Sequence, residues 1–272
     1  MEIRSLAGVD LETLTNTFNH SFSDYVVPIQ FDTAYKKIRM QRSRVNLDLS
    51  VGTFAGKELV GFMLFGQDQW NGKSTTYNSG TGVIPPFRGR RLVQKMYDWI
   101  IPKWRQTGIA HTRLEVIQGN DKAIRAYTKV GLQVNRELWS WQAPESSSSS
   151  TSLPSPHLAK MPDWESYTDL LPYQPAWDAM SAGIQATLSD MHCYEWRKAE
   201  ELHAFAILNQ RGQIFQAGCL DSYTLPSFIS HLQQLAPNVS WINLPASSAI
   251  TTNLTASHWQ TTIKQFEMGM DL

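Results

Sequence analysis

The sequence predicts an α/β protein with a mixed β-sheet, divided into two units. Segments with strand and helix patterns alternate along the 272 residues, and 42% of the residues are hydrophobic, which is enough for two cores. Residues 144–157 are dominated by Ser and Pro, cannot build a core and are typical of a linker. The predicted units are therefore residues 1–143 and residues 158–272.

Composition and charge exclude several classes of protein. The 24 basic residues balance the 24 acidic ones, so neither nucleic acid nor an anionic membrane is expected as the main partner. No stretch approaches the ~18 to 20 apolar residues of a membrane span, and the first residues lack the pattern of a signal peptide. The two cysteines form no CxxC pair and suggest a reducing compartment. We expect a cytoplasmic protein whose oligomeric state the sequence leaves open.

The first half of the first unit reads as a strand, two helices and a hairpin. Glu2–Ser5 has the pattern of a short strand, and Asp10 is placed to cap a helix over residues 11–22. A second helix is predicted over residues 33–42. Residues 49–67 read as two strands that turn at "AGKE", which is a hairpin signal.

The second half of the first unit continues as strand, helix, strand, helix and strand. The predicted bounds are a strand at 75–83, a helix from 92 that Pro102 kinks or ends, a strand at 112–117, a helix at 120–130 and a strand at 132–142. Gly131 is placed to stop the last helix. This order predicts a mixed sheet.

The stretch "VIPPFRGRRLVQKM", which begins at Val83, carries three arginines from a strand into a helix. The start of a helix offers unpaired N–H groups and a positive dipole end, which favours an anion. Only Gly89 is available where a backbone must approach a phosphate closely. The pattern predicts an anion site, and the alternative is that Arg90 and Arg91 form a solvated helix start.

Downstream, the helix "NDKAIRAYTKV" places Asn120 at its cap and Ala123 and Tyr127 on one face. Alone, Tyr127 fits a packing role. "VIPPFRGRRL" followed by the strand "LEV" and then by N-x-x-A-x-x-x-Y-x-x-x-G-[FL] resembles the GCN5-related N-acetyltransferase (GNAT) superfamily. The resemblance covers nearly all of the first unit.

This resemblance implies a GNAT fold with a V-shaped, splayed central sheet and the activity of an acetyl-CoA-dependent N-acetyltransferase. Val83 would offer its backbone N–H to the thioester carbonyl, an oxyanion-type donor. Tyr127 would protonate the departing CoA thiolate. Asn120 and Ala123 would line the cofactor. The loop and helix start that would wrap the pyrophosphate comprise Arg88, Gly89, Arg90, Arg91, Leu92 and Val93.

The loop departs from the family pattern [Q/R]-x-x-G-x-[G/A]. Arg88 matches, but Arg91 and Val93 replace the two small residues. If Val93 faces the packed side of the helix the change costs little, whereas facing the pyrophosphate would weaken the grip on CoA. Arg91 could offset that loss as a direct phosphate partner.

The residues for the amine acceptor are less defined. Glu115 alternates away from its hydrophobic neighbours and is the predicted general base, with a structural role as the alternative. Asp24 and Tyr25 lie in a loop where the family builds its acceptor site. Trp139 shares a face with Trp141 and fits either an aromatic wall for the acceptor or the core.

The second unit echoes the order of the first and resembles a degenerate GNAT-like repeat, as in tandem GNAT proteins. One helix is predicted over residues 171–188, followed by a hairpin, helix, strand, helix and strand. Where a cofactor loop should lie, "DSYTLPSF" has no Arg-Gly cluster, so we expect this unit to shape the acceptor cleft rather than to catalyse. His192, Cys193 and His203 lack a second close pair, so no metal site is predicted.

Two functions from different classes follow. The first is direct acetyl transfer from acetyl-CoA to a small-molecule or peptide amine. The alternative is a non-catalytic acyl-CoA-binding or sensor protein, suggested by Arg91, Val93 and the bare second repeat.

Overall fold

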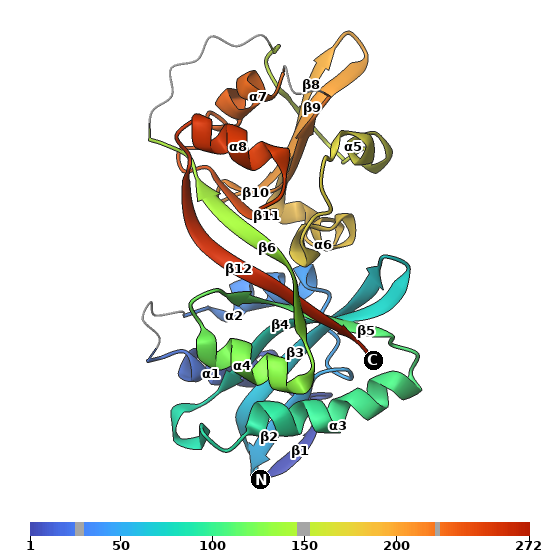
Figure 1. Cartoon of the computed structure of the whole chain (residues 1–272), viewed down its shortest axis with the longest axis vertical. Coiled ribbons are helices and arrows are strands. Elements are labelled where there is room, and N and C mark those ends of the chain that lie inside the picture. Colours follow the sequence, from blue (N-terminus) through green and yellow to red (C-terminus); the bar gives the residue numbers. More distant parts are fainter. Residues whose placement is uncertain (25–29, 146–152, 221–223) are drawn as a thin grey trace. The chain divides into compact units, whose positions relative to one another are not determined.

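A computed structural model describes residues 1–24, 30–145, 153–220 and 224–272 (Figure 1). The chain forms two compact units, one of Met1–Asn135 with Glu267–Leu272 and the other of Arg136–Phe266.

Strands β6 (Gln133–Gln142) and β12 (Gln260–Asp271) each contribute residues to both units. The two compact units meet within these two strands and not at residues 143 and 158. The domain boundaries expected at 143 and 158 stay predictions, because a division by compactness does not test them.

The sheet of the first unit is mixed, as expected for the predicted fold class. Its strands β1 to β4 pair antiparallel, β4 pairs parallel with β5, and the end of β12 follows β5. The strand bounds are β1 (Glu2–Ser5), β2 (Val51–Ala55), β3 (Glu58–Trp70), β4 (Lys73–Val83) and β5 (His111–Ile117). Arg113 of β5 pairs with Glu267 of β12, and both side chains are buried.

Helices cover both faces of this sheet. Their bounds are α1 (Leu11–Ser21), α2 (Thr33–Arg42), α3 (Leu92–Gln106) and α4 (Asp121–Val130), and a short 3₁₀ turn, η1 (Pro85–Phe87), precedes α3. Phe62 and Phe65 of β3 point to opposite faces, since they are an odd number of residues apart. Phe62 contacts Phe18 of α1, and Phe65 packs edge-on against Trp104 of α3 with ring centroids 4.5 Å apart.

Local capping explains where these helices begin and end. The side chain of Asp10 accepts a hydrogen bond from the N–H of Thr13 at 2.8 Å, which confirms the predicted cap. Gly131 ends α4 with φ 114°, in the left-handed region. The helix α3 does not end at Pro102. Pro102 removes a single N–H bond, while buried Ile100 and Trp104 hold the helix on either side of it.

The strands of the second unit continue the same sheet, in the order β12, β6, β11, β10, β9, β8, β7. Only β10 and β11 pair parallel among the pairs described within this unit. The bounds are β7 (His157–Ala159), β8 (Met191–Lys198), β9 (Glu201–Asn209), β10 (Gln213–Cys219), β11 (Ser240–Pro245), α7 (Leu225–Leu232) and α8 (Ala249–Ala256).

The single helix predicted over residues 171–188 is wrong. This segment holds a 3₁₀ turn η2 (Trp177–Ala179), a short helix α6 (Ser181–Gln185) and the start of another turn, η3 (Leu188–Asp190). Pro172 and Pro175 disfavour helical geometry in the residues before them. The prediction also missed β7, β8 and the helix α5 (Trp164–Leu170).

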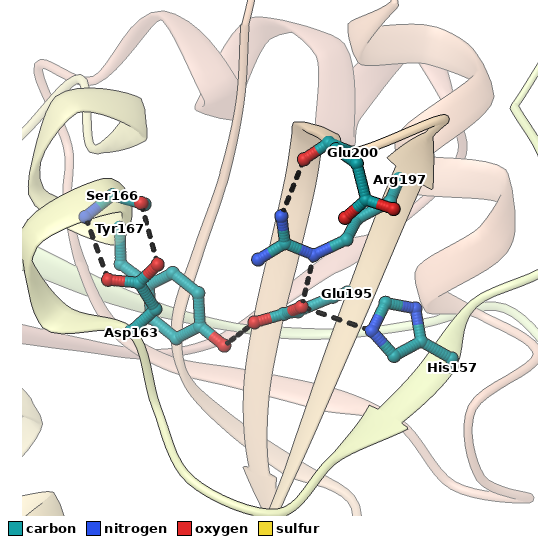
Figure 2. A network of polar contacts seen from close by, with 7 residues as sticks. All are labelled: His157, Asp163, Ser166, Tyr167, Glu195, Arg197 and Glu200. Carbon is teal, nitrogen blue, oxygen red and sulfur yellow. Dashed lines mark hydrogen bonds and ion pairs between the residues drawn. The ribbon is translucent and has the colours of Figure 1, made fainter.

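A polar network fastens α5 and β7 to β8 (Figure 2). Glu195 of β8 is 4% exposed, and its carboxylate accepts hydrogen bonds from Tyr167 Oη at 2.6 Å and Arg197 Nε at 2.7 Å. His157 Nε2 lies 3.1 Å from the same carboxylate. The Tyr167 ring stacks on Phe205 with centroids 4.1 Å apart.

Among the described helices, none is long and apolar enough to cross a membrane.

Candidate active site

The strands β4 and β5 separate in the middle of the first unit. Their pairing runs from Thr75 opposite His111 to Asn78 opposite Leu114, and then stops. At that point Ser79 is an extra residue of β4, because Leu64 pairs with Gly80 while Phe65 pairs with Asn78. A bulge of this kind bends the strand away from its neighbour. The result is a V-shaped opening between β4 and β5.

Val83 points its backbone into this opening. The N–H of Ile84 donates to Val60 O of β3 at 3.0 Å, and Val83 lies opposite Gly61. Because hydrogen-bonded and non-hydrogen-bonded pairs alternate in an antiparallel ladder, the N–H and C=O of Val83 do not bond to β3. Its C=O accepts instead from Arg88 Nε at 3.0 Å. The N–H of Val83 therefore also faces away from β3, as an oxyanion donor must.

A cavity of about 980 Å³ lies at this opening. It is lined by the end of α1, the last residues of β4, the start of α3 and one face of α4. Every residue predicted to bind the cofactor lines it: Val83, Arg88, Gly89, Arg90, Arg91, Leu92, Val93, Asn120, Ala123 and Tyr127. The structure thus brings together two segments that are about thirty residues apart in the sequence.

The start of α3 forms one wall of the cavity. No side chain caps this helix, and its first backbone bond runs from Lys95 N to Arg91 O at 3.1 Å. The amides of Leu92, Val93 and Gln94 therefore have no partner within the helix. Together with the helix dipole they make an anion site.

Arg91 adopts a conformation that normally suits glycine. Its φ of 57° and ψ of 32° lie in the left-handed region, at the position where the family pattern has glycine. For an L-residue this backbone costs roughly 1 to 2 kcal/mol. Val93 is half-buried and lines the cavity. The substitutions thus place strain and extra bulk at the anion site.

Arg88 binds the protein rather than open space. Its guanidinium donates to both carboxylate oxygens of Asp24, at 2.6 and 2.9 Å, and to Ser21 O at 2.8 Å. The hydrogen bond from Arg88 lowers the pKa of Asp24. Since four of its donors are used, Arg88 ties the loop to the end of α1 and has little capacity left for a phosphate.

Three cations that the sequence analysis did not single out also line the cavity. Lys122, Arg125 and Lys129 lie at spacings of three and four residues, so they share one face of α4. That spacing was readable from the sequence. With Arg90 and Arg91 they make the cavity wall strongly basic, whereas Asp24 is the one carboxylate among its described lining residues.

Tyr127 is buried at the inner wall of α4. Its ring meets the Tyr97 ring edge-on, with centroids 6.5 Å apart and planes at 90°. Tyr97 Oη accepts a hydrogen bond from Asn78 Nδ2 at 3.3 Å, and burial raises the pKa of Tyr97. Asn78 also accepts from Gly80 N at 3.0 Å, which holds the bulge. One aromatic contact and one hydrogen bond thus link Tyr127, through Tyr97, to the strand that carries Val83.

The predicted acceptor and base residues do not all reach this cavity. Asp24 lines it, but Glu115 and Trp139 do not, and Tyr25 lies outside the described residues. Glu115 is half-buried on β5, just past the last pair with β4. Trp139 belongs to the second unit, where its Nε1 donates to Glu137 at 3.1 Å and its ring packs against the core.

The second unit contains a similar separation, between β10 and β11. These strands pair only at Gln213 with Ser240 and Ile214 with Trp241, and β10 has a register shift at the next residue. The N–H of Leu220 donates to His203 O at 2.9 Å. Because residues of an antiparallel strand bond to the neighbouring strand alternately, the N–H and C=O of Ala217 face away from β9.

This second opening is filled by the chain itself. The hydroxyl of Tyr173 lies 3.4 Å from both Ala217 N and Ala217 O, accepting from the first and donating to the second. The carbonyl oxygen of Leu170 lies directly against Gly218, where a Cβ would collide with it. Burial raises the pKa of Tyr173. The N–H and C=O of Ala217 are therefore both satisfied within the protein.

A splayed parallel pair, an uncapped helix start and a basic cavity between them define the class: an acetyltransferase fold of the GNAT type. Residues 11–132 match the family model described as Acetyltransferase (GNAT) family, and this segment of the chain is a GNAT domain. No curated protein matches the sequence.

Solved structures share the fold over the whole chain. A putative acetyltransferase from Pyrococcus horikoshii is 13% identical, with a TM-score of 0.71 over 100% of this chain and 89% of that one. A GCN5-related N-acetyltransferase from Sphaerobacter thermophilus is 11% identical, with a TM-score of 0.68 over 99% and 95%. A tandem GNAT protein from the clavulanic acid biosynthesis pathway is 11% identical, with a TM-score of 0.66 over 99% and 98%. The predicted GNAT fold and tandem arrangement are confirmed.

Proposed function

We propose that this protein is an acetyl-CoA-dependent N-acetyltransferase that acts on a small-molecule or peptide amine in the cytoplasm. The observation that carries the proposal is the cavity of the first unit. It brings together the backbone N–H of Val83, the uncapped start of α3 and the side chain of Tyr127. These are the three parts that thioester binding and cleavage require.

The basic wall suits the charge of CoA. The cofactor carries a pyrophosphate and a 3′-phosphate, and the free amides of Leu92, Val93 and Gln94 would hold the former. Arg90, Arg91 and the three cations of α4 would offset the remaining negative charge. Asn120 and Ala123 would line the opposite side of the cofactor.

The proposed chemistry is direct transfer. The amine nitrogen attacks the thioester carbonyl carbon, a C–N bond forms, and the oxyanion accepts a hydrogen bond from the N–H of Val83. The C–S bond then breaks, and the Tyr127 phenol protonates the CoA thiolate. The proton lost by the amine passes to solvent water, since the predicted base Glu115 does not line the cavity, and Tyr127 is reprotonated from solvent. The products are an amide and free CoA.

A thiol-release assay with acetyl-CoA and a panel of amines tests this function. We expect release of free CoA with at least one amine, and a loss of that release in Tyr127→Phe. Calorimetry on the same samples should detect the binding of acetyl-CoA to the protein. An absence of binding at millimolar acetyl-CoA would contradict the proposal.

A second candidate is an acyl-CoA-binding sensor without turnover. It is favoured by the strained Arg91 and by Val93 in the cavity wall, because both depart from the family's loop at the point of closest approach. Binding of acetyl-CoA without CoA release for any amine in the panel would support this candidate over the enzyme.

A further inference from the structure

Ser21 is a buried polar residue that no step above uses. It is the last residue of α1, is 4% exposed and lines the cavity of the first unit. Among the described residues, no group hydrogen-bonds to its hydroxyl. A buried hydroxyl without a partner costs about 1 to 3 kcal/mol, so its persistence in a ligand cavity points to a ligand atom as the partner.

The rest of α1 makes this hydroxyl unusual. Thr15 and Thr17 donate their hydroxyl groups to the carbonyl four residues earlier, at 2.7 and 2.8 Å. Ser23, just past the helix, donates to His20 O at 3.0 Å. Ser21 could take the carbonyl of Thr17 in the same way but does not, so its side chain is directed elsewhere.

The position of Ser21 is fixed from two sides. Its carbonyl accepts from Arg88 Nη2 at 2.8 Å, which ties it to the loop. Its Cβ lies 2.8 Å from the place where a Cβ on Gly82 would stand, so Ser21 packs directly against the β4 backbone. Gly82 precedes Val83. The hydroxyl therefore lies at the β4 end of the cavity, beside the proposed oxyanion donor, rather than along the basic face of α4.

We propose that Ser21 Oγ–H donates a hydrogen bond to the acyl carbonyl oxygen of the bound acyl-CoA, as a second donor beside the N–H of Val83. The inference rests on the proposed function. It involves no proton transfer: the hydroxyl keeps its proton and stabilises the negative charge that develops on the oxygen. Free CoA has no acyl carbonyl, so the hydroxyl distinguishes acyl-CoA from the CoA product.

The test compares Ser21→Ala with Ser23→Ala, a neighbouring serine outside the cavity lining. Calorimetry gives the affinities for CoA and for acetyl-CoA, and difference infrared spectroscopy with a ¹³C-labelled acetyl group reports the thioester carbonyl. In Ser21→Ala we expect an unchanged affinity for CoA and a 2- to 10-fold weaker affinity for acetyl-CoA, which corresponds to one hydrogen bond of about 0.5 to 1.5 kcal/mol. The carbonyl stretch should move to higher frequency, and Ser21→Thr should restore the wild-type values.

The free protein provides an independent readout. Removing an unpaired buried hydroxyl should leave the melting temperature of Ser21→Ala equal to or above that of the wild type. A lower melting temperature would show that the hydroxyl is paired within the protein and would overturn the inference. So would a carbonyl frequency and an acetyl-CoA affinity equal to those of Ser23→Ala. A wild-type protein that binds neither CoA nor acetyl-CoA would instead overturn the proposed function.

Discussion

The two openings, β4 with β5 in the first unit and β10 with β11 in the second, share one backbone plan. In each, a short parallel pairing stops, the first strand has a register shift, and a glycine follows three or four residues on, at Gly82 and Gly218. The first opening holds a cavity, whereas Tyr173 fills the second. The difference indicates that this plan leaves a cavity where no side chain fills the opening: Arg88 bonds only to the C=O of Val83, whereas Tyr173 bonds to both the N–H and the C=O of Ala217.

The helices that follow the two openings also differ in the residue seven positions after the cap. Helix α4 carries Tyr127 seven residues after its cap, Asn120, whereas α8 has Thr255 seven residues after its cap, Ser248. A threonine hydroxyl is a far weaker acid than a phenol and is a shorter group. The second unit thus lacks both the open backbone and the proposed acid of the first.

The largest expected effect comes from removing the phenol of the first unit. Tyr127→Phe should lower CoA release about 100-fold or more, because general-acid catalysis contributes typically 10² to 10⁴. Its affinity for CoA should stay within about threefold, since the ring remains. Thr255→Val is the matched change in the second unit and should leave CoA release unchanged. Equal rates in Tyr127→Phe and wild type would remove the phenol from the mechanism.

Emptying the second opening should act on stability instead. Tyr173→Ala is expected to lower the free energy of unfolding by about 3 to 5 kcal/mol, through the lost packing and the unpaired Ala217 backbone. Urea denaturation measures this. Acetyl-CoA affinity should not change, and a Tyr173→Ala protein as stable as the wild type would show that the second opening is not closed by this side chain.

The network around Glu195 should contribute the next largest effect. Burial alone would raise the pKa of Glu195, but the hydrogen bonds from Arg197 and Tyr167 lower it below its ordinary value of 4.5 overall. The network therefore adds stability above that value and loses it as the pH falls through the lowered pKa. At neutral pH, Glu195→Gln should cost about 2 to 4 kcal/mol. A stability difference from wild type that shrinks as the pH falls below 4.5 would support this, and one that is constant from pH 7 to pH 3 would contradict it.

The smallest effect concerns the strained loop. Arg91→Gly should raise the stability of the free protein by about 1 kcal/mol, because glycine adopts a positive φ without cost. Arg90→Gly is the control. Since Arg90 is not among the residues with positive φ, the same change there should destabilise the protein. Melting curves that rank the two variants in the opposite order would show that the backbone of Arg91 is not strained.

Much of the first unit could be predicted because its signals are local. Asp10, Asn120 and Gly131 mark helix ends through residue type and position alone. The segment 171–188 failed for the opposite reason. The hydrophobic spacing around Trp177 fits a helix, yet two prolines and the packing of this segment against β9 and β10 favour short turns.

The sequence predicted which residues line the cavity but not which hydrogen bonds their side chains form. Motif order placed Val83 and Tyr127 in one site, and the cavity contains both. The ion pair of Arg88 with Asp24 joins residues 64 positions apart. No local sequence pattern could therefore indicate that the donors of Arg88 are already used within the protein. The unpaired hydroxyl of Ser21 likewise appears only when the neighbours of α1 are known.

Titration calorimetry with acetyl-CoA tests the central claim most directly, because it counts the sites that the two openings provide. We expect one molecule bound per chain, with binding weakened about tenfold in Lys122→Ala/Arg125→Ala and unchanged in Tyr173→Phe. The loss in the double variant follows from two charged contacts to phosphate of about 0.5 to 1 kcal/mol each. No binding, or two molecules per chain, would contradict the account.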